Sequence, residues 1–167
     1  MKKSPLEILD IYRERINTQL EFHLSSNFIE ESSKSDLGSI MKYSVLAGGK
    51  RFRPILTYTI ASLFGIKLEK VDKSACAIEL IHIYSLIHDD LPAMDDDDIR
   101  HNQLSSHKAF GEAQAILAGD ALQALAFKVI SSDELLDSDV KVSLLNLLAK
   151  SSYEMADGQS IDLSIIS

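Results

Sequence analysis

An apolar segment that leads directly into a cluster of aspartates is the feature that most constrains this chain. Residues 75–87 are mostly apolar, and six of the ten residues 89–98 are aspartates. Pro92 removes a backbone donor and clashes with the carbonyl group of His88, so a helix through the apolar segment must stop or distort near the first aspartates. Carboxylates at a helix C-terminus oppose the helix dipole and repel one another. We therefore expect a positively charged ligand at this position.

The chemistry of the aspartate cluster favours Mg²⁺. The cluster offers hard oxygen ligands without histidine or cysteine partners, which selects Mg²⁺ or Ca²⁺. Because Mg²⁺ typically takes one or two carboxylates and keeps waters and substrate phosphates, the cluster suits a metal–phosphate bridge. An EF-hand is excluded, since a loop that starts at Asp96 carries His101 at the sixth position instead of glycine. A solvated acidic loop is the alternative, which the preceding apolar helix and Pro92 disfavour.

A basic segment, GGKRFRP at residues 48–54, supplies the opposite charge. Lys50, Arg51 and Arg53 follow two glycines, so cations lie beside backbone N–H groups that can also face an anion. Arginine offers a planar fork and lysine a point charge, which together suit a diphosphate. The segment lacks the spacing and the terminal Ser or Thr of a P-loop. Its alternative reading is a helix C-cap followed by a basic loop.

The fold class predicted for the whole chain is all-α. Apolar residues recur at spacings of three and four, and we find no convincing alternation of period two. We expect one domain over residues 1–167, in which Gly119 allows another helix to approach closely. The predicted helices cover Pro5–Phe28, about 35–48, about 54–65, about 71 to the aspartates, Glu112–Ile130 and Asp137–Met155.

Charge and composition exclude several classes of protein. The 167 residues carry a net charge of −8, which disfavours non-specific binding to nucleic acid or to anionic membranes. No continuous apolar stretch suggests a signal peptide or a membrane span, so we expect a cytoplasmic protein. The single cysteine, Cys76, excludes an internal disulfide and a zinc site built from cysteines.

One face of the predicted helix before the aspartates carries polar side chains. His82, Ser85 and Asp89 lie at spacings of three, four and seven, and Tyr84 projects beside them. We therefore expect a pocket along this face. For His82 alone, a hydrogen-bonded core histidine is the alternative.

Four spaced segments together resemble the trans-isoprenyl diphosphate synthase family, most closely its bacterial farnesyl diphosphate synthase branch. The resemblance extends over essentially the whole chain. It implies an antiparallel helix bundle of the isoprenoid synthase type and, as in the relatives, a homodimer. The four segments are GGKRFRP at 48–54, IHIYSLIHDDLPAMDDDD at 81–98, FGEA at 110–113 and LAGDAL at 117–122.

The resemblance implies a role for each matching residue. The aspartates would hold Mg²⁺ against the diphosphate of an allylic substrate, and the basic segment with a helix histidine would hold isopentenyl diphosphate. By position, the metal-binding residues are Asp89, Asp90 and Asp95, with Asp89 and Asp95 as the direct ligands, and Arg100 contacts the allylic diphosphate. Contacts to isopentenyl diphosphate come from Gly49, Lys50, Arg53, His82 and His101.

The implied reaction is Mg²⁺-assisted ionisation of dimethylallyl or geranyl diphosphate, followed by attack of the isopentenyl double bond on the allylic cation. Tyr84 and Ser85 stand one helical turn before Asp89, a pattern that resembles farnesyl-forming members. A bulkier residue there, as in Ser85→Phe, is expected to shorten the product. Two alternatives stay open, a geranylgeranyl diphosphate synthase and a non-catalytic helical partner of a complete synthase.

The chain also departs from the family pattern. The usual R-R-G-x-P-T stretch is RHNQLS at residues 100–105, so His101, which is neither always charged nor a five-donor fork, stands where a second arginine is usual. A G-G-Q segment appears as DGQ at residues 157–159. The chain covers a little over half of a typical member and lacks the second aspartate-rich motif. We therefore expect an incomplete bundle, and no turnover by this chain alone.

Overall fold

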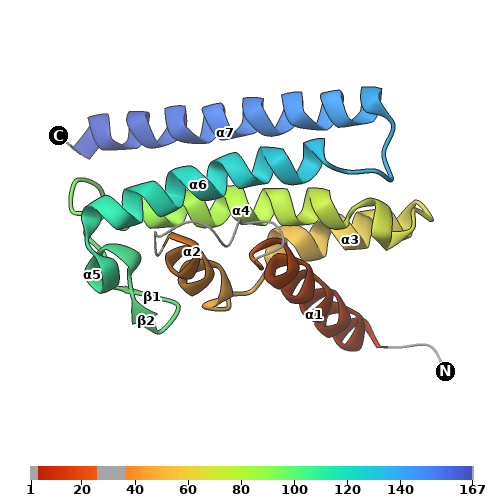
Figure 1. Cartoon of the computed structure of the whole chain (residues 1–167), viewed down its shortest axis with the longest axis horizontal. Helices are drawn as coiled ribbons and strands as arrows, with labels where there is room; N and C mark the ends of the chain where they lie inside the picture. The colour runs from red at the N-terminus through yellow and green to blue at the C-terminus, as the bar shows by residue number, and fades with distance from the viewer. Residues whose placement is uncertain (1–3, 26–36, 167) are drawn as a thin grey trace.

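The computed structural model describes residues 4–25 and 37–166, which form a bundle of α-helices (Figure 1). A short 3₁₀ turn, η1 (Leu68–Lys70), and one small hairpin complete the described part. The hairpin pairs β1 (Ile99–Arg100) with β2 (Gln103–Leu104) in antiparallel register. The helices are α1 (Pro5–His23), α2 (Leu37–Leu46), α3 (Phe52–Leu63), α4 (Asp72–Asp89), α5 (Ser106–Phe110), α6 (Glu112–Ser131) and α7 (Ser138–Ile166).

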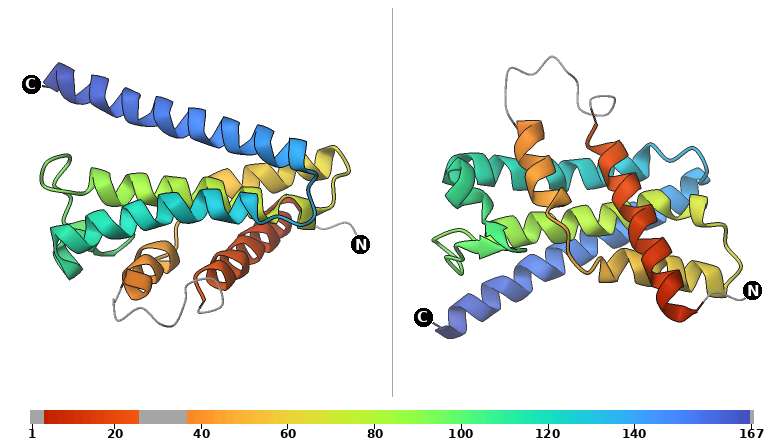
Figure 2. Two further views of the ribbon diagram at one scale, coloured as in Figure 1. Left: turned by 45° about the horizontal axis from the view of Figure 1, so that its top comes forward. Right: turned by 90° about the horizontal axis from the view of Figure 1, so that it is seen from below.

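Helices α4 and α6 run side by side in opposite directions through the middle of the bundle (Figures 1 and 2). Their shared surface is made of small and branched apolar side chains, among them Ala77, Leu80, Ala118 and Leu122, all fully buried. Helices α1, α2 and α3 cover one side of this pair, and α7 packs along the other. The pair therefore forms a central core that contacts every other helix of the described residues.

The ends of the first helices follow from local sequence. Ser4 and Glu7 form a capping box at the start of α1, where each side chain bonds the other residue's backbone N–H. Gly48 and Gly49 have positive φ angles of 99° and 115°, which separate α2 from α3. Pro92 lies just after α4, and α4 ends at Asp89 with Asp90 as its C-cap, as the sequence predicts.

The structure confirms an all-α class and corrects four details of the sequence analysis. The polar loop expected before α6 contains the β1–β2 hairpin and the short helix α5. Helix α7 continues eleven residues beyond the predicted end at Met155, through Gly158, because one glycine in a long helix costs only about 1 kcal/mol. Helix α3 begins two residues before Pro54. The first helix also ends earlier than predicted, at His23 with Leu24 as its C-cap, and the predicted end at Phe28 lies outside the described residues.

Within the described residues, one helix is long and apolar enough to cross a membrane by length and composition, namely α6. Its apolar side chains have partners within the fold, because Leu122, Ala126 and Val129 are fully buried in the core. Its composition is therefore that of a central core helix.

Candidate functional site

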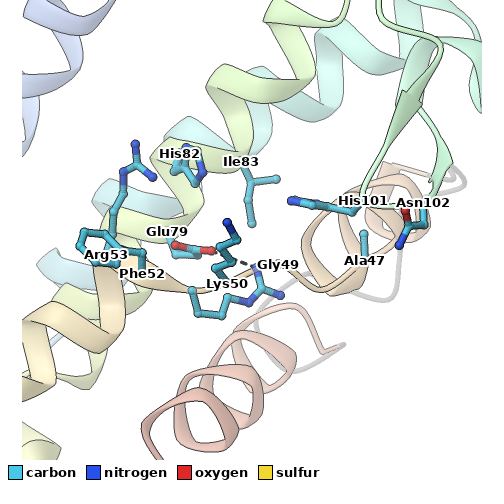
Figure 3. Close-up of a pocket in the computed structure, with 11 residues that line it drawn as sticks. Ala47, Gly49, Lys50, Phe52, Arg53, Glu79, His82, Ile83, His101 and Asn102 are labelled. Atoms are coloured by element: carbon cyan, nitrogen blue, oxygen red, sulfur yellow. Dashed lines mark hydrogen bonds and ion pairs between the residues drawn. The ribbon is translucent and has the colours of Figure 1, made fainter. Parts of the chain in front are cut away.

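Helix α4 borders a cavity of about 470 Å³ that we call the cationic cavity (Figure 3). The loop before α3 and the first turn of α3 supply one wall, α4 a second, and the tip of the β1–β2 hairpin a third. All five residues expected to contact isopentenyl diphosphate line this one cavity, although they come from three separate parts of the chain. They are Gly49, Lys50, Arg53, His82 and His101.

The tip of the β1–β2 hairpin lies close to the loop that carries Gly48 and Gly49, and this contact shapes the cavity. A Cβ atom built on Gly49 would lie 3.3 Å from Nε2 of His101, tighter than an ordinary van der Waals contact. The φ angle of Gly49, +115°, is also one that side-chain-bearing residues rarely adopt. Glycine therefore suits the backbone conformation at this position, and an added Cβ would also require His101 to shift by a few tenths of an ångström.

Arg51 has a structural role. The sequence analysis grouped it with Lys50 and Arg53 as a cation available to an anion, and the structure corrects this. Its side chain is buried, and its guanidinium donates hydrogen bonds to Asn17 Oδ1 (2.9 Å), Glu79 Oε1 (3.0 Å) and the carbonyl oxygen of Val45 (2.6 Å). These bonds tie α1, α2 and α4 together beneath the cationic cavity. The charges that remain for an anion in this segment are those of Lys50 and Arg53.

The two histidines of the cationic cavity are held neutral near pH 7. Burial lowers the pKa of His82 to about 4, and the charge of Arg53 acts in the same direction. Burial also lowers the pKa of His101, helped by the charges of Arg100 and Arg51. Lys50 and Arg53 therefore supply the positive charge at neutral pH, and the imidazoles supply neutral hydrogen-bonding groups.

A second cavity of about 350 Å³ lies between α4 and α7, and we call it the aspartate cavity. Tyr84, Ser85 and Asp89 face it from α4, while Met155 and Gln159 face it from α7. The structure thus divides the polar face expected on this helix, because His82 lines the cationic cavity and the other three residues line the aspartate cavity.

Asp89 and Asp95 are brought together where α4 ends. The backbone N–H of Asp95 donates to the carbonyl oxygen of Asp89 at 2.9 Å, which folds the loop back over the helix end. Burial raises the pKa of Asp89, and the negative charges of Asp95 and Asp90 raise it further. This repulsion indicates uncompensated negative charge, and the all-oxygen donor set fits Mg²⁺.

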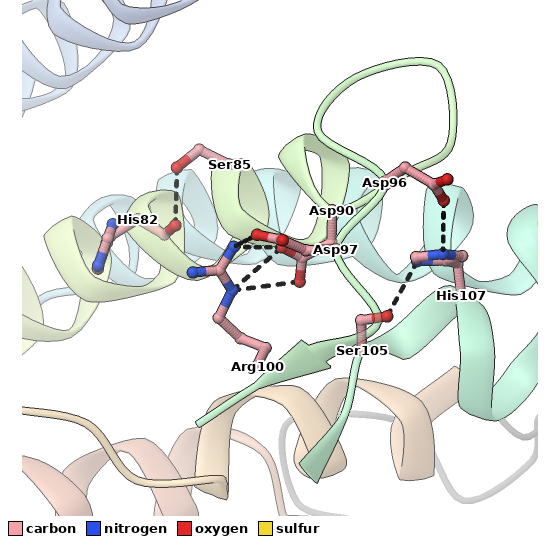
Figure 4. Close-up of polar contacts among 8 residues, drawn as sticks. All are labelled: His82, Ser85, Asp90, Asp96, Asp97, Arg100, Ser105 and His107. Carbon is pink, nitrogen blue, oxygen red and sulfur yellow. Dashed lines mark hydrogen bonds and ion pairs between the residues drawn. The ribbon is translucent and has the colours of Figure 1, made fainter. Parts of the chain in front are cut away.

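Asp90 is engaged differently from its neighbours (Figure 4). Its carboxylate is almost fully buried and accepts hydrogen bonds from Nε and Nη2 of Arg100 at both oxygens. Arg100 also donates from Nη2 to Asp97 at 3.0 Å. Asp90 was expected among the metal-binding residues, and in the structure its carboxylate is occupied by Arg100. Arg100 itself lines neither the cationic cavity nor the aspartate cavity.

Two features of the site were missed in the sequence analysis. Glu79 lines the cationic cavity, with Oε1 bonded to Arg51 and Oε2 buried without a hydrogen-bond partner among the described residues. Met155 and Gln159 reach the aspartate cavity from a helix that was expected to end at Met155. Gln159 belongs to the DGQ segment, so the resemblance pointed to it without assigning it a place.

Comparison with known proteins gives the same family from sequence and from structure. A family model described as polyprenyl synthetase matches residues 34–166. The farnesyl diphosphate synthase of Haemophilus influenzae is 43% identical over 153 residues, covering 90% of this chain and 52% of that protein. The farnesyl diphosphate synthase of Escherichia coli is 51% identical over 128 residues, covering 74% of this chain and 42% of that protein.

Among solved structures, a geranyltransferase from Legionella pneumophila superposes with a TM-score of 0.89 at 43% identity. The match covers 95% of this chain and 56% of that one. The chain thus spans about half the length of the relatives that it matches.

Proposed function

The chain belongs to the polyprenyl synthetase family and has the helical fold of its isoprenoid synthases, and we propose that it supplies the diphosphate-binding part of a farnesyl diphosphate synthase. The proposed reaction condenses isopentenyl diphosphate with dimethylallyl or geranyl diphosphate. One observation supports the proposal: α4 borders both a cavity lined by Lys50 and Arg53 and a cavity lined by Asp89. Two diphosphates can therefore bind beside one helix.

In this proposal the cationic cavity binds isopentenyl diphosphate. Lys50 and Arg53 neutralise the diphosphate, with Arg53 offering its planar fork. The backbone of Gly49 approaches the anion closely because no Cβ intervenes. His82 and His101 complete the polar wall as neutral donors at pH 7. A chain with a net charge of −8 needs such a local exception to bind an anion.

The aspartate cavity takes the allylic diphosphate. Asp89 and Asp95 are the proposed Mg²⁺ ligands, and Arg100, whose guanidinium is held by Asp90, is proposed to contact the same diphosphate. When bound, Mg²⁺ supplies charge stabilisation for the departing diphosphate. The allylic carbon–oxygen bond breaks and the diphosphate leaves with the electron pair. The isopentenyl double bond then forms the new carbon–carbon bond, and a proton passes to the departed diphosphate.

Tyr84 and Ser85 line the aspartate cavity one helical turn before Asp89, which supports a role in limiting chain length. Ser85→Phe in a complete relative should shorten the product, because the aromatic ring would fill the path of the growing chain. Unchanged product lengths by chromatography would contradict this assignment.

Calorimetric titration of the 167-residue chain tests the binding function directly. Inorganic diphosphate should bind in the presence of Mg²⁺, and Asp89→Asn should reduce the Mg²⁺-dependent part at least tenfold. Asp139→Asn is the matched control, since Asp139 lies in the first turn of α7, at the opposite end of the bundle (Figure 1). Equal Mg²⁺-dependent binding by wild type and Asp89→Asn would refute the metal assignment.

Turnover by the isolated chain is not expected. Leu147, Tyr153 and Ile161 on α7 are more than half exposed, so few apolar walls enclose a prenyl chain among the described residues. Farnesyl diphosphate formed by the purified chain from isopentenyl and geranyl diphosphates with Mg²⁺ would contradict this. Activity only with a complete synthase present would favour a partner role. Homodimer formation and a cytoplasmic location stay predictions.

A further inference from the structure

We propose that Asp96, Asp98 and His107 form a binding site for a divalent transition-metal ion, distinct from the proposed Mg²⁺ site. One ligand atom from each residue lies within 4.8 Å of the other two. The two aspartates come from the loop that follows α4, and the histidine comes from α5. Figure 4 shows Asp96 of this loop and His107 of α5 facing each other.

The state of His107 points to a ligand. Its side chain is only 3% exposed, and its Nδ1 lies 3.1 Å from Oγ of Ser105. Its Nε2 is buried, has no hydrogen-bond partner among the described residues, and lies 4.0 Å from Oδ1 of Asp96. A buried polar atom without a partner is costly. A ring held at one nitrogen by a hydrogen bond and free at the other is the usual arrangement of a metal-binding histidine.

The spacing between ligand atoms suits a shared ion. Bonds of about 2.0–2.2 Å from a metal to nitrogen and to oxygen place those two atoms roughly 3–4 Å apart, depending on the angle at the metal. Nε2 of His107 and Oδ1 of Asp96 are already 4.0 Å apart. The side chains of Asp96 and Asp98 are 59% and 68% exposed, so both carboxylates can close around an ion without disturbing the core.

Lys108 is the cation that now faces the cluster. Its Nζ lies 2.8 Å from Oδ1 of Asp98 and 3.6 Å from Oδ1 of Asp96. Its side chain is 37% exposed, so the ammonium group can turn to solvent when an ion enters. Lys108 therefore competes with the metal. Its removal should strengthen metal binding, whereas removal of a ligand should weaken it.

The donor set selects the class of metal. An imidazole nitrogen beside two carboxylates suits Zn²⁺ or Co²⁺ better than Mg²⁺, which prefers oxygen ligands alone. Such an ion would pin the loop that carries Asp95 onto α5. The proposal rests on His107 and its neighbours and does not depend on the proposed prenyltransferase function.

Titration of the 167-residue chain with Zn²⁺ alone, without diphosphate, provides the test. Wild type should bind Zn²⁺ at a site that His107→Gln weakens at least tenfold, while Lys108→Ala should tighten it severalfold. The imidazole nitrogen resonances of His107 should shift on Zn²⁺ addition. Asp89→Asn should leave this binding intact, which separates it from the proposed Mg²⁺ site.

Asp98→Asn provides a second ligand variant that leaves the buried histidine in place, so a folding defect in His107→Gln cannot hide the result. This variant should also lose affinity for Zn²⁺. Equal Zn²⁺ affinity in wild type, Asp98→Asn and Lys108→Ala, without a shift of the His107 resonances, would overturn the proposal.

Discussion

The imidazole of His88 occupies the space in which a side chain of residue 119 would begin. A Cβ atom built on Gly119 would lie 2.3 Å from Nε2 of His88 and 2.6 Å from its Cδ2. The same Nε2 lies 3.1 Å from the carbonyl oxygen of Ile116, to which its N–H can donate, and the ring packs edge-on against Tyr84. Because His88 immediately precedes Asp89, this contact fixes the end of α4 against α6 and confirms that Gly119 permits a close approach.

Gly119→Ala should therefore destabilise the chain, although alanine is the better helix former. Displacing His88 from its packed position should cost about 1–3 kcal/mol, partly offset by about 1 kcal/mol from helix propensity. Urea unfolding measures the difference. Gly158→Ala, in α7, is the matched control, because a Cβ added to Gly158 would meet no neighbouring atom within 4 Å. This variant should stabilise the chain by roughly 0.5–1 kcal/mol.

A double-mutant cycle isolates the contact between the two residues. If His88 is the obstacle, Gly119→Ala should cost less in a His88→Ala background than in the wild type. The same cost in both backgrounds would show that the alanine clashes with something other than the imidazole.

Glu79 should prove important for stability because it neutralises the buried guanidinium of Arg51. The two side chains are 5% and 2% exposed and their charged atoms lie 3.0 Å apart. Removal of one partner from a buried ion pair typically costs about 3–5 kcal/mol, so Glu79→Ala should unfold at a much lower urea concentration.

The control for Glu79→Ala is Glu154→Ala, which breaks the exposed pair with Lys150 and should change stability by about 0–1 kcal/mol. Similar losses of unfolding free energy in Glu79→Ala and Glu154→Ala would show that the buried pair contributes no more to stability than the exposed one.

The sequence was sufficient for the elements whose signals are local. Pro92 marked the end of α4, and the paired glycines marked the boundary between α2 and α3. The β1–β2 hairpin was missed because its two-residue turn, His101–Asn102, has positive φ angles at both positions without the usual glycine. Tertiary contacts of the hairpin, such as the bond from Tyr43 Oη to the carbonyl oxygen of Leu104, support a turn that local propensity does not predict.

The site residues also divide into those that the sequence could place and those that only tertiary contacts reveal. The resemblance assigned Lys50, Arg53 and His82 to one ligand, and these residues line one cavity, but residue type alone could not separate Arg51 from them. Arg51 is distinguished by its burial against Glu79, a residue 28 positions away. Asp90 differs from Asp89 in the same way, because only the fold reveals that Arg100 contacts both of its oxygens.

Acid should destabilise the fold through His82. Its pKa is lowered to about 4 in the folded chain, whereas an unfolded histidine titrates near 6.5. Between these values the unfolded chain binds more protons, so stability should fall as the pH drops from about 6.5 toward 4. His23 and His101, whose pKa values are also lowered, act in the same sense.

Urea midpoints measured between pH 7.5 and 4.5 test the contribution of His82. The variant His82→Gln should show a shallower decline than wild type, with a residual slope from the other two histidines. Asp89 has the opposite effect on stability, because its pKa is raised on folding and the folded chain therefore binds its proton more readily. This effect appears at the acid end of the measured pH range. Parallel curves for wild type and His82→Gln would contradict the lowered pKa.

The affinity of the cationic cavity for a diphosphate should rise as the pH falls, because His101 gains a positive charge there. Its pKa lies below the ordinary value of about 6.5, and a bound anion favours the protonated ring. His101 shares the cavity with Lys50, Arg53, His82 and the Arg51–Glu79 pair. The imidazole of His101 is exposed at the tip of the hairpin, whereas burial lowers the pKa of His82 to about 4.

Calorimetric titration with inorganic diphosphate at pH 8 and pH 6 measures this effect, and His101→Gln corrects for the titration of the ligand itself. Wild type should gain severalfold more affinity than His101→Gln over this range. His101→Arg should bind more tightly than wild type at pH 8 and lose the extra pH dependence, because a guanidinium stays charged throughout. If wild type and His101→Gln gain affinity equally, the imidazole does not contact the anion, and the hairpin tip only shapes the cavity.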